Sequence, residues 1–268
     1  ESKELIQIRA KLIALADSER AAHSKNYMKS DYAFYGLKVP EMRAIAKQIA
    51  KTISIYDAYN LFDELWNSGN HEEMSFAAFL LQNYKKDMNL DMWKFLMHGD
   101  KPRIEKAKSW DHIDDISSHL TGVIFLNNSA TLQPEIKTLS QSRNSWMRRL
   151  AIVSQYPSIK KGKIQLAILL AEKLCYDEDI YVQKGTGWML REVGKKNSIQ
   201  VQEFIKIHRG MKPFALSYAL EKMPQFKVLI KSLKEEDKLT KGKLKPQETE
   251  GVLGNNSSEL NSIKYFKN

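Results

Sequence analysis

The sequence contains a single cysteine, Cys175, among its 268 residues. One cysteine cannot form an internal disulfide, and it excludes every zinc site built from several thiolates. We expect Cys175 to be a small buried hydrophobic residue without chemistry. No run reaches the roughly 18 apolar residues of a membrane span, and the first residues lack the basic and then apolar pattern of a signal peptide. We therefore expect a protein without a membrane anchor in a bacterial-type cytoplasm.

The motifs that hold nucleotides or activate a serine are also missing. There is no GKS or GKT phosphate loop, no GxGxxG turn and no nucleophile elbow. The string HEEMS, which begins at His71, lacks the second histidine of a zinc protease helix. The carboxylates of DHIDD bunch at an expected helix start, where Asp111 can simply favour the helix dipole. We therefore expect no metal and no cofactor.

Positive charge is in excess. The formal net charge is +10 and the sequence pI is about 9.4. Such a balance favours a polyanionic partner. An anionic membrane surface is the weaker choice, because no basic helix has a clean apolar side that could face lipid.

Apolar residues recur at spacings of three and four up to about residue 230, and no stretch alternates as a strand would, so the sequence predicts an all-α fold. Glu73, Trp110, Trp146 and Tyr181 each fall at an expected helix start, at intervals of 37, 36 and 35 residues. That period is typical of a HEAT-like solenoid of helix pairs, here with a concave basic face. A non-repetitive helical bundle is the alternative. Breaks between helices are predicted at Tyr35-Gly36, 67–70, 98–100, 127–129, Pro157 and 194–197.

The composition changes near residue 231. From there to residue 268 the chain is charged, carries Gly251 and Gly254, and shows little apolar periodicity. We predict a repeat domain over residues 1–230 and a partly ordered or mobile tail over residues 231–268.

The segment from 178 to 196 places an aromatic residue away from the core. Its predicted apolar face consists of Val182, Thr186, Met189, Leu190 and Val193. Trp188 lies opposite, beside Tyr181, Lys184 and Arg191, which indicates a binding surface. The alternative is that a neighbouring repeat covers Trp188. Two glycines inside the helix, Gly185 and Gly187, indicate a close approach, by a ligand or by another helix.

Three more positions stand out on helical wheels. Trp110 and Asp114 share an edge beside the apolar cluster of Ile113, Ile116, Leu120 and Ile124. Arg149 falls within the arc of Ile152, Val153 and Tyr156, whereas Arg148 projects to a flank. A charge inside an apolar arc needs an anion, which could be a phosphate or an intramolecular carboxylate.

A basic stripe is predicted near the N-terminus. Pro40 suits a first helical turn, and Arg43, Lys47 and Lys51 follow at intervals of four. Such a stripe is usually a solvated face, but on a concave solenoid it would lie where duplex DNA could reach it.

Four strings, in order and in register, resemble one known family: YMKSDYAFYGLKVPEMR, WDHID, SWMRRLAI and VQKGTGWMLREVGK. Together they are similar to the AlkD-type alkylpurine DNA glycosylases built from HEAT-like repeats, over about residues 20–200. The resemblance implies a catalytic cleft formed by Trp110, Asp114 and Trp188, with Arg149 on a DNA phosphate. The residues expected to contact DNA are Arg149, Arg148, Lys184, Arg191, Tyr27, Lys38, Arg43 and Lys47.

The activity implied by the resemblance is hydrolysis of the N-glycosidic bond of cationic N3- or N7-alkylated purines in duplex DNA, by a monomer that reads the backbone without a tight base pocket. Two residues depart from the family pattern: Lys38 stands where a neutral polar residue is expected, and Ser109 replaces a tryptophan. Some relatives bind nucleic acid without excising a base, so a non-enzymatic DNA-binding protein is the alternative. A protein-interaction scaffold, the third possibility, leaves the position of Trp188 unexplained.

Overall fold

The computed structural model describes residues 2–224, 226, 228 and 231, and over these residues the chain is all-α. The predicted tail, residues 231–268, lies outside the described residues apart from Lys231. Among the described residues, β-type backbone pairing occurs as an isolated bridge between Ala33 and Asn70. The helices are α1 (Lys3–Ile13), α2 (Ser18–Met28), α3 (Val39–Ile49), α4 (Ile55–Trp66), α5 (His71–Leu81), α6 (Leu90–Met97), α7 (Trp110–Ile116), α8 (Gly122–Asn127), α9 (Ser129–Leu139), α10 (Ser145–Val153), α11 (Tyr156–Lys160), α12 (Gln165–Leu174), α13 (Ile180–Gly194), α14 (Ser198–Ile207) and α15 (Pro213–Ala219).

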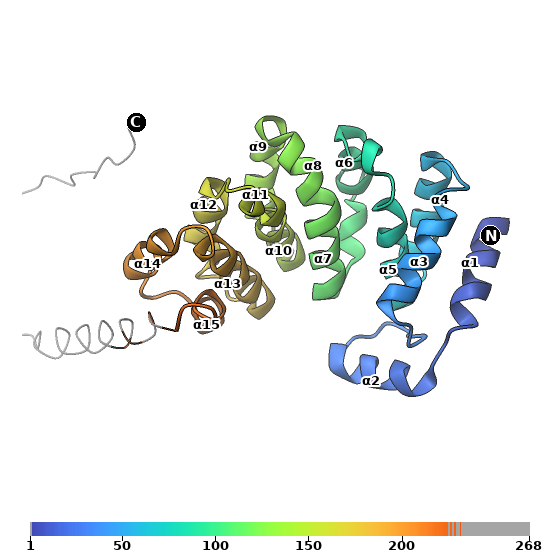
Figure 1. Cartoon of the computed structure of the whole chain (residues 1–268), viewed down its shortest axis with the longest axis horizontal. Coiled ribbons are helices and arrows are strands. Elements are labelled where there is room, and N and C mark those ends of the chain that lie inside the picture. The colour runs from blue at the N-terminus through green and yellow to red at the C-terminus, as the bar shows by residue number, and fades with distance from the viewer. Residues whose placement is uncertain (1, 225, 227, 229–230, 232–268) are drawn as a thin grey trace, which may run out of the picture. The chain divides into compact units, whose positions relative to one another are not determined.

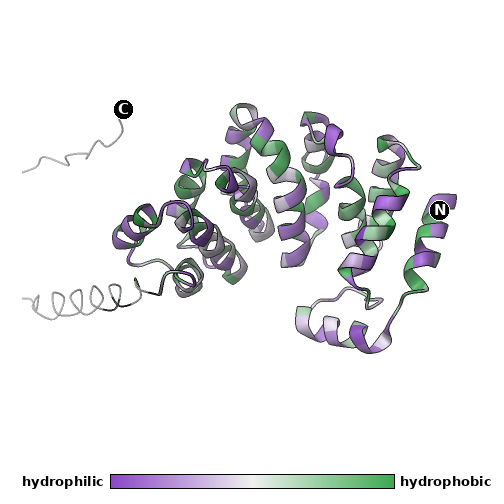
Figure 2. Cartoon of the chain, viewed as in Figure 1, coloured by the Kyte–Doolittle hydropathy of each residue, from purple (hydrophilic) through white to green (hydrophobic). Residues whose placement is uncertain are grey.

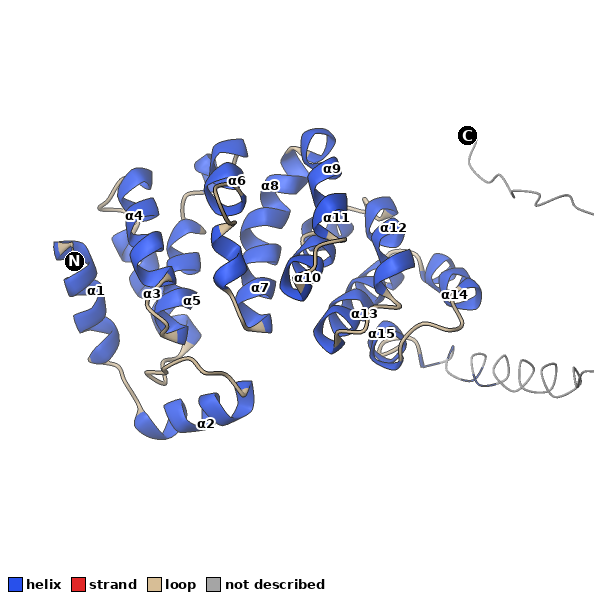
Figure 3. Cartoon of the chain, turned by 180° about the vertical axis from the view of Figure 1, so that it is seen from behind, coloured by secondary structure: helices blue, strands red, loops and turns tan. Residues whose placement is uncertain are grey.

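Within the unit Glu1–Ile230 the helices form two layers (Figures 1 and 3). In one layer α3, α5, α7, α10, α13 and α15 contact one another in chain order. Other helices pack behind them, as α4 does on α5 and α12 on α13, whereas α2 buries none of its residues. The four predicted repeat starts lie in the first turns of α5, α7, α10 and α13, so the helical-repeat fold is confirmed.

The apolar faces of the helices meet between the layers. Ile113, Ile116, Leu120 and Ile124 are fully buried, as their spacing predicts. Figure 2 shows green and purple segments alternating along the helices of the array, while α2 is mostly purple or pale. Cys175 is buried, and burial raises the pKa of its thiol to about 12, so it is an unreactive core residue as predicted.

The predicted breaks coincide with turns. Gly36, Gly69 and Gly99 have φ of 80°, 74° and 118°, a region that glycine occupies without strain. Pro157 lies in the first turn of α11, where its missing N–H is no loss. No helix of the described residues is long and apolar enough to span a membrane.

A π-helical turn at Ser117–Thr121 joins α7 to α8 in one continuous helix. Directly after it, a side chain at Gly122 would overlap the carbonyl of Ser154 and the ring of Pro157. The glycine therefore lets the widened turn press against α10 and α11. This contact fixes α7 relative to α10, the two helices that carry Asp114 and Arg149.

Candidate functional site

Seven of the residues predicted from the sequence gather around one pocket of about 250 Å³, here called the cleft. They come from α2, α7, α10 and α13, four elements that the sequence separates widely. Tyr181 and Tyr218 complete the lining, although neither was predicted as a site residue. The cleft is lined by Tyr27, Trp110, Asp114, Arg149, Tyr181, Lys184, Trp188, Arg191 and Tyr218.

Trp110 and Asp114 lie one turn apart on α7, at the edge of its apolar face. Both are partly exposed, whereas Ile113 and Ile116 on the same helix are fully buried. The buried isoleucines hold α7 against the core, so its next face is turned toward the cleft. The predicted edge position of Trp110 and Asp114 is confirmed.

Arg149 holds the Asp114 carboxylate with two parallel hydrogen bonds. Its Nε donates to Oδ1 and its Nη2 to Oδ2, each at 2.8 Å, and Nη1 donates to the backbone carbonyl of Tyr181. Only 6% of the Arg149 side chain and 16% of the Asp114 side chain are exposed. Of the two partners that the sequence left open for Arg149, the structure shows the intramolecular carboxylate.

Burial raises the pKa of Asp114, and the Arg149 guanidinium opposes that rise. A bidentate guanidinium is a strong partner for a buried carboxylate, because it satisfies both oxygens at once. The ion pair therefore fixes the orientation of Asp114 in the free protein.

One glycine explains how Arg149 reaches the cleft. A side chain at Gly185 on α13 would lie 3.1 Å from Arg149 Nη1 and 3.3 Å from its Cγ. The second glycine, Gly187, faces α15, and a side chain there would overlap the Ala215 carbonyl and Tyr218. Both predicted close approaches are confirmed, and in each case the approaching group belongs to another helix.

Aromatic rings and cations form the wall made by α13. The Trp188 ring is half-buried and lies 5.6 Å from the Tyr156 ring. Lys184 Nζ lies 5.0 Å from the Phe214 ring centre and has no carboxylate partner among the described residues. Arg191 pairs with Glu221 and lies 3.6 Å from Glu192. The wall can therefore offer an unpaired cation beside a tryptophan face.

Four predicted DNA contacts do not line the cleft: Arg148, Lys38, Arg43 and Lys47. Arg148 makes a bidentate ion pair with Asp177, at 2.6 and 2.9 Å, and also donates to the Ser142 carbonyl. Arg148 does not line the cleft, and its ion pair raises the pKa of its guanidinium. Its donors are occupied by the protein itself, which indicates that Arg148 ties α10 to the loop before α13.

The residues of the predicted basic stripe also differ in their surroundings, because some are held within the protein and others are exposed. Arg43 donates to Gln82 and Asp115 and lies 4.0 Å above the Phe79 ring, so it links α3 to α5 and α7. Lys38 and Lys47 are exposed, Lys38 as the N-cap residue of α3. The stripe is thus not uniformly solvated, because its first member takes part in tertiary structure.

The strings HEEMS and DHIDD, neither of which predicts a site by itself, lie next to each other in the structure. His71 Nε2 lies 2.8 Å from Asp111 Oδ2, and the rings of His71 and His112 stack with their centres 4.4 Å apart. Neither string indicates this pairing when it is read by itself. Residues about 40 apart become neighbours once consecutive repeats pack, and that spacing was the signal.

His71, Asp111 and His112 offer ligand atoms within 4.8 Å of one another, the distance range of a metal site. Their geometry favours hydrogen bonding. The two imidazole planes are 27° apart, and His71 Nε2 is already within hydrogen-bond distance of Asp111 Oδ2. His112 Nε2 also lies 3.0 Å from the His71 carbonyl, to which it can only donate. Burial lowers the pKa of His112 to about 4, which keeps its ring neutral.

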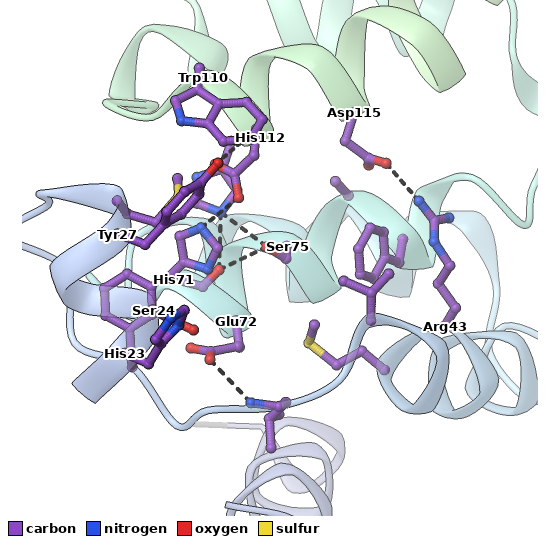
Figure 4. Close-up of a pocket in the computed structure, with 18 residues that line it drawn as sticks. His23, Ser24, Tyr27, Arg43, His71, Glu72, Ser75, Trp110, His112 and Asp115 are labelled. Carbon is purple, nitrogen blue, oxygen red and sulfur yellow. Dashed lines mark hydrogen bonds and ion pairs between the residues drawn. The ribbon is translucent and has the colours of Figure 1, made fainter. Parts of the chain in front are cut away.

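A second pocket, of about 390 Å³, lies beside the cleft and shares Tyr27 and Trp110 with it. Figure 4 shows Tyr27 and Trp110 at one end of this pocket and the Arg43–Asp115 ion pair at the other. We call it the apolar pocket. It is lined by His23, Ser24, Tyr27, Met28, Phe34, Leu37, Val39, Met42, Arg43, His71, Glu72, Ser75, Ala78, Phe79, Trp110, Asp111, His112 and Asp115.

Solved structures with the same fold come from two bacteria. The predicted DNA alkylation repair enzyme of Enterococcus faecalis superimposes with a TM-score of 0.67 at 23% identity, over 78% of this chain and 96% of that one. AlkD2 of Streptococcus mutans gives a TM-score of 0.54 at 17% identity, over 75% of this chain and 94% of that one. The smu.31 protein of Streptococcus mutans UA159 gives 0.53 at 18%, with the same coverage.

No match was found among curated proteins. The sequence model of one family, described as DNA alkylation repair enzyme, matches residues 8–223. That range covers most of the chain, including every residue that lines the cleft. The chain therefore belongs to the family of DNA alkylation repair enzymes.

Proposed function

We propose that the protein is a DNA glycosylase, which hydrolyses the N-glycosidic bond of cationic N3- or N7-alkylated purines in duplex DNA. The observation that carries this proposal is the position of one carboxylate. Asp114 lies in the lining of a cleft whose other walls are Trp110, Trp188 and the cations Lys184 and Arg191. A carboxylate between tryptophans suits a substrate that becomes positively charged at the sugar, and the surrounding cations suit the phosphates on either side.

The reaction needs little acid catalysis. An alkylated purine already carries a positive charge, so the electron pair of the breaking C1′–N bond neutralises it as it leaves. The sugar becomes oxocarbenium-like, water attacks C1′, and the released proton passes to solvent. Asp114 stabilises the developing charge and accepts a hydrogen bond from the attacking water. The faces of Trp110 and Trp188 pack on the deoxyribose and attract the same charge, by roughly 0.5–2 kcal/mol each.

Arg149 has two roles in this proposal. In the free protein its fork orients Asp114. A phosphate of the bound strand competes for the same donors, and transfer of Arg149 to that phosphate frees the carboxylate beside the sugar. Binding of DNA and exposure of the reacting carboxylate would then be one event.

The Asp114–Arg149 ion pair also favours a second candidate, a protein of the same fold that binds DNA without cleaving it. In that protein the carboxylate stays paired and only holds α7 to α10. The two candidates share their affinity for DNA and differ in whether base is released.

The test measures both properties on one duplex that carries a single 7-methylguanine. Binding is followed by fluorescence anisotropy at several salt concentrations, and free base is quantified over time. Salt-sensitive binding together with base release supports the glycosylase. Salt-sensitive binding without release of 7-methylguanine, or of 3-methyladenine in a second duplex, supports the non-enzymatic protein.

A further inference from the structure

We propose that Tyr218 is a further residue that contacts DNA in the cleft, and that its hydroxyl donates a hydrogen bond to a backbone phosphate of the bound strand. The inference rests on one part of the proposed function, the position of DNA in the cleft, and it applies to the glycosylase and to the non-enzymatic candidate alike. It follows from the position of Tyr218, from the packing of α15 on α13, and from a hydroxyl without a partner.

Tyr218 lies in the lining of the cleft, together with Trp110, Asp114 and Trp188. It comes from α15, a helix that contributes no other described residue to that lining. The side chain is partly exposed, so it is open to a bound molecule. A strand that places its sugar beside Asp114 therefore has Tyr218 in the same pocket of about 250 Å³.

The sequence of α15 turns Tyr218 toward the cleft. Ala215 and Ala219, four residues apart, are fully buried, and Tyr218 lies at the edge of this buried face. Phe214, one turn before Tyr218 at the same edge, has its ring centre 5.0 Å from Lys184 Nζ. This edge of α15 therefore faces the cations of α13.

Close packing on α13 holds Tyr218 in place. Figures 1 and 3 show α15 beside α13, and a side chain at Gly187 would lie 2.6 Å from Tyr218 Cβ, closer than real contacts allow. Gly187 is three residues after Lys184 and four before Arg191. Tyr218 therefore stands opposite the middle of the helical segment that carries both cations.

The hydroxyl of Tyr218 has no hydrogen-bond partner among the described residues. The same is true of Tyr27 and Tyr181, the other tyrosines of the lining, whereas Tyr35 outside the cleft donates to Glu73 at 2.8 Å. Tyrosine hydroxyls that are partly removed from water usually bond to the protein or to a bound molecule. An unpaired donor in the lining of a cleft therefore indicates a ligand that accepts a hydrogen bond.

Of these three tyrosines, Tyr218 is the one whose role is open. Tyr27 is already an expected DNA contact, and the ring of Tyr181 packs against Trp146 with the ring centres 5.1 Å apart. The ring of Tyr218 makes no described contact with another aromatic ring or with a cation.

The charges of the cleft leave a place for a neutral donor. In the free protein Arg149 pairs with Asp114, and Arg191 pairs with Glu221. Lys184 has no carboxylate partner among the described residues, so it is the cation that attracts a phosphate first. Uncharged side chains, tyrosine among them, are ordinary phosphate contacts that fix the register of a bound strand. A phosphate that Lys184 attracts can therefore accept a hydrogen bond from the tyrosine.

The first test measures binding of the full-length protein to an undamaged duplex, so that no cleavage is involved. Tyr218→Phe removes the hydroxyl and nothing else. We expect the affinity to fall about tenfold, as for the loss of a hydrogen bond to a charged group. The slope of log affinity against log salt should stay the same, because no charge is removed. An affinity equal to that of the parent would overturn the inference.

Tyr56→Phe is the matched control, because it removes the hydroxyl of a tyrosine that is 75% exposed on α4, which packs behind α5. Its affinity for DNA should equal that of the parent. Thermal unfolding of Tyr218→Phe should also match the parent, since the hydroxyl has no partner in the free protein. An equal loss of affinity in Tyr56→Phe, or a lowered Tm in Tyr218→Phe, would indicate an indirect effect and contradict the contact.

Duplexes with a single methylphosphonate locate the phosphate. This neutral linkage weakens hydrogen bonds to the phosphate that it replaces. At the contacted phosphate, the losses of affinity from the methylphosphonate and from Tyr218→Phe should not add, because both remove the same interaction. At the other positions the two losses should add. Additive losses at every position of both strands would show that Tyr218 donates to no phosphate.

Base release from the 7-methylguanine duplex separates this inference from the proposed function. Release by the parent, with equal DNA affinity in the parent and in Tyr218→Phe, leaves the glycosylase standing and removes the contact. No release from any duplex, with losses that fail to add at one phosphate, removes the glycosylase and keeps the contact. Release by the parent together with such a phosphate supports both proposals.

Discussion

At the scale of single residues, Arg149 and Asp114 depend on each other. Because both are largely buried, removing the guanidinium leaves a carboxylate without its partner. We expect Arg149→Met to lower the free energy of unfolding by about 3 kcal/mol, the lower end of the range for breaking a buried ion pair. Urea unfolding at pH 7 measures this.

The double variant Arg149→Met with Asp114→Leu is the control. Removing both charges leaves no unpaired group, so most of the lost stability should return. If the double variant is as unstable as the sum of the two single variants, the ion pair is not what holds α7 to α10.

His112 should make stability depend on pH. Burial lowers its folded pKa from 6.5 to about 4, and the nearby Asp111 carboxylate opposes that shift. Between these two pKa values the unfolded chain binds more protons, so stability falls as the pH drops from about 6.5 toward 4. The largest slope from this one group is about 1.4 kcal/mol per pH unit.

The measurement compares urea unfolding of the parent and of His112→Gln from pH 7.5 to 4.5. The variant is less stable throughout, because it loses the contact to the His71 carbonyl, but its curve should be flatter. Parallel curves would show that another group causes the pH dependence.

At the scale of elements, the glycines of α13 differ in what they touch. A side chain at Gly187 meets the backbone of α15, which cannot move aside, whereas one at Gly194 meets the flexible end of Met223. We expect Gly187→Ala to destabilise the protein by about 1–3 kcal/mol through overpacking. Gly194→Ala should stay within about 1 kcal/mol of the parent, because alanine also favours the helix. Thermal unfolding of both variants tests this, and equal losses would contradict it.

The helices of the layer that contains α5, α7, α10 and α13 could be predicted because each carries a local signal. The aromatic or acidic residue that begins each repeat, the apolar spacing after it and the glycine breaks all act within one helix. The helix α2 has no such signal, because its mean hydropathy is low and none of its residues is buried. The π-turn at Ser117–Thr121 was also not predicted, because it arises where Gly122 presses on the next repeat.

At the scale of the whole molecule, the part of the cleft that forms between consecutive repeats could be predicted from the sequence. Trp110, Asp114 and Trp188 were identified by their position off the apolar faces, and Asp114 and Arg149 lie 35 residues apart, one repeat. Tyr27 came from the resemblance alone. Tyr218 was missed because its place depends on how α15 packs against Gly187, which no pattern within α15 encodes.

DNA binding also belongs to the scale of the whole molecule. Lys184 lies in the cleft lining without a carboxylate partner among the described residues, and Lys173 is exposed on α12, which packs behind α13. If Lys184 contacts a phosphate, Lys184→Met should reduce the slope of log affinity against log salt by about 0.9. Lys173→Met should leave the slope unchanged. Anisotropy titrations from 50 to 200 mM salt measure both slopes. Equal slopes for the two variants would contradict a DNA contact at Lys184.

The central claim is that Asp114 makes the cleft catalytic, and single-turnover release of 7-methylguanine from duplex DNA tests it most directly. The protein is used in excess, with Asp114→Asn and, as a control, Asp91→Asn at an exposed carboxylate of α6. The account predicts release by the parent and by Asp91→Asn, and at least a hundredfold slower release by Asp114→Asn at saturating DNA. Equal rates in the parent and in Asp114→Asn would show that the carboxylate does not take part in the reaction.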